Sequence, residues 1–230
     1  MAKNAAGTEF LGEEIGKTID YVSLLYELRC SKPENPIAII DKVLKDFSEY
    51  IEYKLEKPAA LFPVNLLSSV IKGNHPKALE YLIEKKVNIK LGVYMAAIYG
   101  RPECLEIIIK HGGKVDFVPI AMLFSPLFHA INNDNLQCAE ILLQNGAEPN
   151  YEVLGRSPMN CAIKNHNANA VKLLAYYGAK YYGDNPAIKT LIESFLNYVQ
   201  QQKSGVVDHP QQSEVDITGK VEKEVVTEDV

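Results

Sequence analysis

The sequence contains no long apolar run. Its longest apolar stretch, residues 117–124, has only eight residues, whereas a helix that crosses a bilayer needs roughly 20. The first residues also lack the apolar segment of a secretory signal. These absences predict a soluble protein with no membrane span and a cytoplasmic location.

An excess of basic charge is also missing. The chain has 24 basic and 29 acidic residues, which gives a net charge of −5. Most of that charge lies after residue 202, where three lysines face seven acidic side chains. The rest of the chain is close to neutral and has no basic footprint of the kind that binds nucleic acid. We therefore expect no nucleic-acid partner.

The cysteines are few and widely spaced. No C-x-x-C pair occurs among Cys30, Cys104, Cys138 and Cys161. Two of them, Cys104 and Cys138, stand where a buried helix position normally carries an aliphatic residue. They are predicted to act as small core side chains in a reducing compartment.

The residue patterns that hold cofactors are absent as well. No His or Cys pair has metal-ligand spacing, and Gly112-Gly113 is interpreted as a helix stop and not as a phosphate-binding loop. The sequence therefore predicts no metal and no cofactor. Three histidines fall at expected turns and are predicted to be solvated: His75, His111 and His166.

What the sequence does contain is one pattern that occurs twice. Residues 125–131 (SPLFHAI) align with 157–163 (SPMNCAI), and residues 140–147 (EILLQNGA) align with 172–179 (KLLAYYGA), at a constant offset of 32. A fixed period of 20 to 50 residues is typical of stacked repeats. We expect Leu142 and Leu173 to occupy matching places in neighbouring layers.

Each copy predicts a helix, a turn and a second helix. Ser125 and Ser157 can cap the first helix, each ahead of a proline at its first position. Apolar residues at three-and-four spacing give the second helix one buried face. Gly146 and Gly178 end it, because glycine adopts the left-handed C-terminal conformation without steric cost.

This pattern resembles the ankyrin repeat, with its serine- or threonine-proline opening, its alanine and its glycine-alanine close. The family's later asparagine and loop glycine match Asn150 and Gly155. The family's opening histidine is replaced by Phe128 and Asn160, so we expect the adjacent loops to be held less firmly. The resemblance implies a non-catalytic protein that binds another protein.

Two earlier units follow the pattern less closely. The positions equivalent to the turn between the helices are Asn74, Gly100, Asp134 and His166, at steps of 26, 34 and 32 residues. The step of 26 predicts a shortened connector near residues 86–91, where Lys86 replaces the terminating glycine. The connector 117–124 is almost wholly apolar. It either contacts a partner, packs as local core, or covers the N-terminal helices.

We therefore expect an all-α ankyrin-repeat solenoid of about four helix-turn-helix repeats. An N-terminal helical cap precedes them and a C-terminal capping helix follows, because the end units of a solenoid must face water. The predicted segments are a flexible arm at 1–16, the divergent cap at 17–60, the repeats at 61–182, the capping helix at 183–203 and a disordered acidic tail at 204–230.

The resemblance also implies where a protein partner binds, namely the concave face and the connector tips. The positions that follow the alanine pair are Ile98, Tyr99, Asn132, Asn133, Lys164 and Asn165, and the connectors add Met122, Phe124, Val153, Leu154 and Arg156. We expect Phe124, Met122 and Tyr99 to form the centre of this patch. The alternative for the polar positions is an ordinary solvated surface. Four further tyrosines (176, 177, 181 and 182) are expected to pack against the capping helix, or else to contact a partner.

Other functions compete with this one. His129 and Cys161 occupy corresponding positions of adjacent first helices, which would suit a hydrolase or transferase, but no orienting acid or oxyanion hole is recognisable. Residues 117–124 could alternatively mediate self-association, so we expect a monomer or a weak homo-oligomer. The acidic residues of 222–229 resemble the C-terminal signals of effectors that intracellular bacteria deliver into a host cytosol. The alternatives there are a solubilising tail or a ligand for a carboxylate-binding pocket.

Overall fold

The structure is a computed structural model, and it describes residues 20–46, 66–119 and 122–203. The expected arm at 1–16, part of the expected cap, and the acidic tail at 204–230 lie outside these ranges. In the described residues the only β feature is an isolated bridge between Val153 and Arg156. The fold is all-α, as expected.

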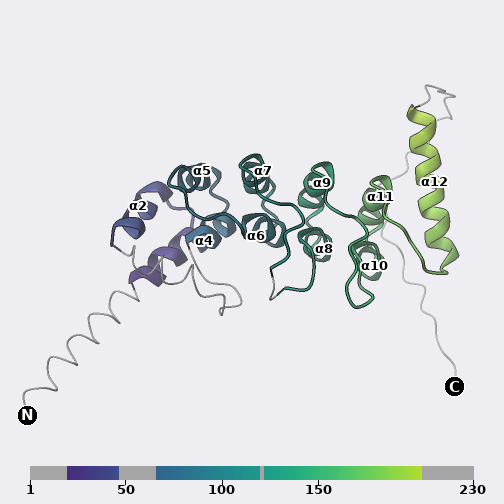
Figure 1. The fold of residues 1–230 in the computed structure, drawn as a ribbon, viewed down its shortest axis with the longest axis horizontal. Coiled ribbons are helices and arrows are strands. Elements are labelled where there is room, and N and C mark those ends of the chain that lie inside the picture. The colour runs from purple at the N-terminus through teal and green to yellow at the C-terminus, as the bar shows by residue number, and fades with distance from the viewer. Residues whose placement is uncertain (1–19, 47–65, 120–121, 204–230) are drawn as a thin grey trace, which may run out of the picture.

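Eight of the described helices, α4 to α11, form four consecutive pairs, and Figure 1 shows these pairs arranged in two rows. The first helices of the pairs are α4 (Leu66–Gly73), α6 (Gly92–Tyr99), α8 (Pro126–Asn132) and α10 (Pro158–Lys164). The second helices are α5 (Pro76–Glu84), α7 (Pro102–Lys110), α9 (Leu136–Gln144) and α11 (Ala168–Tyr176). Each first helix packs on its own second helix and on the first helix of a neighbouring pair. The predicted solenoid of four repeats is confirmed.

The turn between the two helices has the same backbone conformation in every pair. The φ angles of Asn74, Gly100, Asp134 and His166 are 58°, 61°, 59° and 53°. These four left-handed residues are the positions that the sequence aligned, although three of them are not glycine. Asparagine and aspartate tolerate this region better than other residues do, so most of the turns are built at modest cost.

The helix starts also follow the sequence. The hydroxyl oxygens of Ser125 and Ser157 accept hydrogen bonds from the backbone N–H groups of Phe128 and Asn160, both at 3.1 Å. These caps satisfy N–H groups that have no partner within the first turn.

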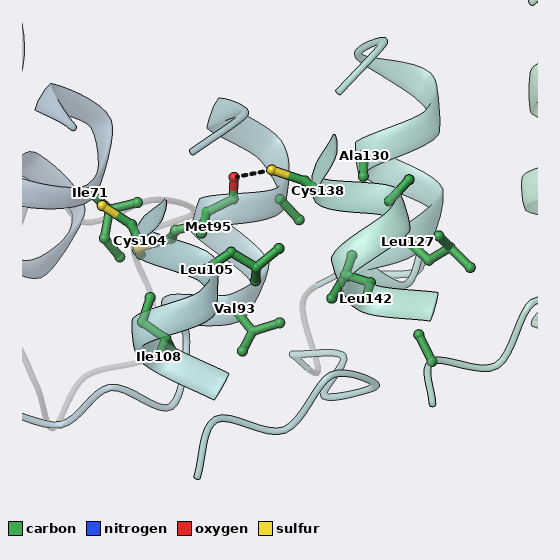
Figure 2. Close-up of a cluster of buried hydrophobic side chains, with 14 of the residues drawn as sticks. Ile71, Val93, Met95, Cys104, Leu105, Ile108, Leu127, Ala130, Cys138 and Leu142 are labelled. Carbon is green, nitrogen blue, oxygen red and sulfur yellow. Dashed lines mark hydrogen bonds between the residues drawn. The ribbon is translucent and has the colours of Figure 1, made fainter. Parts of the chain in front are cut away.

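The core runs continuously through the stack, between the two rows. Figure 2 shows its middle, where Leu105, Leu127 and Leu142 are fully buried. The partner of Leu142 in the next layer is Leu174, which is also fully buried, and not Leu173, which is half-buried. The expected match was therefore wrong by one residue, because at the 32-residue offset Leu173 corresponds to the half-buried Ile141.

Connector length varies as the spacing predicts. Seven residues (85–91) join α5 to α6, whereas fifteen (111–125) join α7 to α8 and thirteen (145–157) join α9 to α10. Lys86, which replaces the expected glycine, is left-handed at φ 61°. The chain therefore keeps the backbone of a glycine stop at this position without the glycine.

Additional helices lie at both ends of the stack. Residues 20–30 are helical, and α2 (Pro36–Asp46) packs on α5. The imidazole Nε2 of His75 lies 2.8 Å from the Leu28 carbonyl oxygen. His75 was expected to be solvated, and this was wrong, because it hydrogen-bonds the C-terminal end of the first described helix.

The C-terminal helix α12 (Pro186–Lys203) packs on α11. Asn185 caps it by accepting a hydrogen bond from the backbone N–H of Ala187 at 3.0 Å. Leu191, Ile192 and Leu196 are its side chains that contact the core.

Candidate functional site

The candidate surface consists of the first helices and the connectors that lead into them. The eleven residues selected from the sequence all lie there, but they differ in exposure. The hydrogen bonds of the polar residues and of the surrounding turns determine how much of this surface is free to meet a partner.

The asparagines at the ends of the first helices bond to neighbouring repeats. The side-chain N–H of Asn133 donates to the Ile98 carbonyl at 3.0 Å, and that of Asn165 donates to the Asn132 carbonyl at 3.4 Å. The Asn132 amide oxygen accepts the Cys161 thiol at 3.5 Å. These asparagines remain exposed, yet their polar groups already link consecutive units.

A second set of inter-repeat bonds starts from the residue after each left-handed turn. The guanidinium group of Arg101 donates two hydrogen bonds, of 2.8 and 3.0 Å, to the Lys72 carbonyl. The Asn135 side chain donates to the Ala97 and Ile98 carbonyls at 2.9 and 3.1 Å. The sequence pattern does not single out Arg101 or Asn135, although both directly follow aligned positions.

The connectors are also linked to one another. The Asp116 carboxylate accepts a hydrogen bond from the Glu148 backbone N–H at 3.2 Å, and the Asn150 side-chain oxygen accepts one from the Lys180 N–H at 2.8 Å. Asn150 is the asparagine that the ankyrin pattern matched. These bonds hold consecutive connectors in place even though Phe128 and Asn160 replace the family's opening histidine.

The apolar connector is neither wholly packed nor wholly exposed. The Phe124 ring stacks on the Phe128 ring at a centroid distance of 4.3 Å and contacts the core. Phe117 and Met122 are half-buried, whereas Leu123 is 54% exposed. Phe124 therefore behaves as local core, and the neighbouring Leu123, which the sequence analysis did not select, is the more accessible side chain.

The next connector ends in a tight hairpin. The backbone groups of Val153 and Arg156 exchange hydrogen bonds of 3.1 and 2.9 Å, which leaves Leu154 and Gly155 at the tip. Leu154 has a φ of 52° and is 81% exposed. A branched apolar side chain at positive φ is uncommon, and the Leu154 side chain is also exposed to solvent.

The expected centre of the patch is divided in the structure. The Tyr99 ring lies at the end of α6 under the Lys72 ammonium, 5.5 Å from its centroid. The contacts of Phe124 are at the opposite end of the first helices, with Phe128, His129 and Arg156. Ile98 is half-buried and Lys164 is exposed beside the same turns as the asparagines.

The residues of the catalytic alternative have other partners. His129 Nε2 lies 2.7 Å from the Tyr94 hydroxyl, while the Cys161 thiol donates to Asn132. Burial lowers the pKa of His129, and burial raises the pKa of Cys161. A thiol that resists ionisation and an imidazole engaged elsewhere do not form the activated pair that a nucleophile requires.

The other two buried thiols also resist ionisation. Burial raises the pKa of Cys104 to about 12 and that of Cys138 to about 11. The Cys138 thiol donates to the Ala96 carbonyl at 3.7 Å, the bond drawn in Figure 2. Both cysteines are core side chains, as their sequence positions predicted.

The tyrosines near the C-terminal end are only partly covered. Tyr177 packs against the core. The Tyr176 ring contacts the Tyr177 ring edge-to-face, with centroids 5.0 Å apart, and Tyr176 remains 45% exposed. Tyr182 is 79% exposed. Burial of the whole cluster was expected, and the structure places only part of it in the core.

The described ranges contain no group of three or more His, Cys, Asp or Glu residues placed to hold a metal ion. In the same ranges, none of the helices combines the length and hydropathy needed to cross a membrane.

Comparison with known proteins agrees with this geometry. The family profile described as ankyrin repeats (3 copies) matches residues 93–185. The crystal structure of the human ASB11 ankyrin repeat domain has a TM-score of 0.50 and 19% sequence identity, and the match covers 70% of this chain and 84% of that one. At this identity the likeness concerns the fold alone.

Two curated relatives carry the same repeats. A putative ankyrin repeat protein of Rickettsia felis is 29% identical over 124 residues, which are 46% of this chain and 55% of the relative. Human ankyrin repeat and SOCS box protein 11 is 25% identical over 108 residues, 47% of this chain and 33% of the relative. The chain thus spans about half or less of the length of these relatives. The family match identifies residues 93–185 as ankyrin repeats, a general protein–protein interaction module, and the repeat geometry and these relatives agree with it.

Proposed function

We propose that this protein binds a partner protein through its first helices and connector tips and has no chemistry of its own. The observation that carries the proposal is Leu154. This side chain is 81% exposed, has a left-handed backbone and stands at the tip of a hairpin closed by hydrogen bonds. A left-handed backbone strains a leucine, and exposure of its apolar side chain gains no burial energy. Residues that lower folding stability in this manner are typically retained for function.

The neighbouring connector supports the same surface. The Tyr151 hydroxyl donates to the Leu123 carbonyl at 3.5 Å, and Arg156 lies over the Phe124 ring. Leu123 and Leu154 are therefore exposed apolar side chains on two connectors that contact each other. Exposed apolar side chains carried by ordered backbone are the usual centre of a protein interface.

A substitution of Leu154 separates binding from stability. Asparagine accepts positive φ readily, and Asn-Gly is the preferred pair in tight hairpins. We expect Leu154→Asn to unfold at the same or a higher denaturant concentration than the native protein, and to capture its partner at least about tenfold less well, as for loss of an interface anchor. Tyr182→Ser, which removes an exposed aromatic outside this surface, is the matched control.

The measurement is affinity capture from a cell extract with quantitative mass spectrometry, in parallel with urea unfolding. A protein captured by the native chain and by Tyr182→Ser, but not by Leu154→Asn, supports the proposal. Equal capture by all three chains would show that this surface is not the binding site.

A narrower version of the proposal is that the protein acts in a host cytosol as an effector that recruits or blocks a host protein. The acidic composition of residues 204–230 supports it. Fusing the chain to a translocation reporter and replacing the acidic residues of 222–229 by their amides tests this version. Unchanged delivery of the neutralised chain would remove its support.

A further inference from the structure

Three cations on the first-helix side of the stack each lie over an aromatic ring of a neighbouring unit. The Lys72 ammonium is 5.5 Å from the Tyr99 centroid, and the Lys90 ammonium is 4.7 Å from the Phe117 centroid. The Arg156 guanidinium carbon is 5.9 Å from the Phe124 centroid. A cation over a ring is held in place without losing its charge.

These charges are not neutralised within the described part of the chain. Within those residues, Lys189 forms an ion pair with Asp184 at 3.7 Å. Lys72, Lys90 and Arg156 form no ion pair with any of the described residues. Their positive charges therefore remain available to carboxylates of another molecule.

The first helices add no negative charge to this side. The helices α4, α6, α8 and α10 contain no aspartate or glutamate, whereas they carry Lys72 and Lys164. Among the connectors, the Asp116 carboxylate accepts the Glu148 backbone N–H of the next connector, and the Glu148 carboxylate accepts the Asn150 backbone N–H of its own connector. Glu152 is a further exposed acid here.

One groove on the opposite side of the stack has the reverse character, although the second helices also carry Lys77, Lys110 and Lys172. An open groove of about 430 Å³ lies between the second helices α7 and α9. Three of its lining residues are carboxylates, Glu103, Glu106 and Glu140. An acidic ligand is repelled from this groove and attracted to the first-helix side, so the charge pattern selects one face of the stack.

We propose that the ligand of this surface is an acidic peptide segment of the partner protein. Its carboxylates meet Lys72, Lys90 and Arg156, and its apolar side chains contact Leu123 and Leu154. The inference rests on the proposed function and adds the chemistry of the ligand.

The length of the segment follows from the geometry. Lys72 lies at the C-terminal end of α4 and Arg156 directly precedes α10, so the two cations are three helix spacings apart along the row and one helix length apart along the helix axes. At roughly 8–10 Å per spacing and about 10 Å per helix, they are about 26–32 Å apart. An extended chain of about 8–10 residues covers that distance at about 3.3 Å per residue.

The test uses a displayed library of random 16-residue peptides, selected on the full chain. Enriched peptides are expected to carry several Asp or Glu residues interspersed with apolar ones. A synthetic peptide of the enriched sequence is expected to bind at least about tenfold more tightly than its copy with Asn and Gln in place of the acids, and to weaken between 0.05 and 0.3 M salt, where screening increases.

A triple variant, Lys72→Gln, Lys90→Gln and Arg156→Gln, is expected to lose about tenfold or more in affinity. Its fold is expected to persist, because the hydrogen bonds of these three residues are made by backbone atoms. The matched control changes three lysines of the second helices to glutamine, at Lys77, Lys110 and Lys172, and is expected to bind as the native chain does.

Three results would overturn the inference. Enrichment of neutral or basic peptides that lose binding on Leu154→Asn would keep the proposed function and reject the acidic ligand. Binding that is insensitive both to the triple variant and to Leu154→Asn would reject this surface as well. Absence of any enrichment would reject only a linear acidic ligand.

Discussion

The Tyr94 hydroxyl lies 2.7 Å from the Nε2 atom of His129 and links the first helices of two consecutive repeats. The rings also contact edge-to-face, with centroids 5.1 Å apart. Tyr94 is buried, and burial raises its pKa to about 12. His129 takes further edge contacts from Phe124 and Phe128, so one polar pair lies within an otherwise aromatic layer.

This environment predicts a pH dependence of stability. Burial lowers the pKa of His129, so between the unfolded value near 6.5 and the lower folded value the unfolded chain binds more protons. The free energy of unfolding should therefore fall as the pH drops below about 6.5 and should be independent of this group above it. Urea unfolding at a series of pH values measures the effect.

The matched variant for this prediction is His129→Gln, which keeps a polar group near Tyr94 but does not titrate. Its stability is expected to fall less between pH 7 and pH 5 than that of the native chain. Parallel pH profiles for the two chains would contradict the assignment to His129.

Much of the fold could be predicted because the repeat supplies two aligned copies. The serine caps, the four left-handed turns and the shortened connector all follow from positions that recur. Packing in the divergent end units could not be predicted in the same way. His75 and Leu196 each acquire a partner from an element that has no aligned counterpart, so their contacts depend on tertiary packing alone.

The candidate site was less predictable than the fold for a related reason. The sequence identified the connector 117–124 as apolar, but it could not show that Phe124 would stack on Phe128 and leave Leu123 as the exposed side chain. It also could not pair cations with rings of another unit, because Lys90 and Phe117 are 27 residues apart and only the stacking brings them together. Residue type indicated the surface, and packing decided which atoms are free.

Lys86 provides a test of the backbone at a helix stop. Its left-handed φ of 61° is costly for lysine and costs glycine nothing. We expect Lys86→Gly to raise the free energy of unfolding by about 0.5–1 kcal/mol, measured by urea denaturation. Lys85, with a φ of −76°, is the control. Lys85→Gly should destabilise the protein by a similar amount, and a gain at both positions would refute the conformational explanation.

The four thiols are expected to differ strongly in reactivity. Cys30 is exposed, whereas Cys104, Cys138 and Cys161 are buried, with pKa values raised by burial. At pH 8 a disulfide reagent should modify Cys30 rapidly in the native protein and the other three only as the chain opens or unfolds. Mass spectrometry of the labelled peptides measures each rate. Modification of Cys161 faster than Cys30 would revive the catalytic alternative.

Asn135 tests whether the bonds between repeats are needed for stability. Its half-buried side chain donates to the Ala97 and Ile98 carbonyls, at the end of the preceding first helix, where carbonyl groups lack partners within the helix. Asn135→Ala removes both bonds and should lower the free energy of unfolding by about 1–3 kcal/mol. Asn133→Ala removes two exposed bonds, the one donated to Ile98 and the one accepted from Asn132, and should cost about 0.5–1 kcal/mol. Asn133 also lies on the proposed binding surface. If Asn133→Ala lowers ligand affinity but not stability, this residue contacts the partner. If it lowers stability but not affinity, the residue serves to link the repeats.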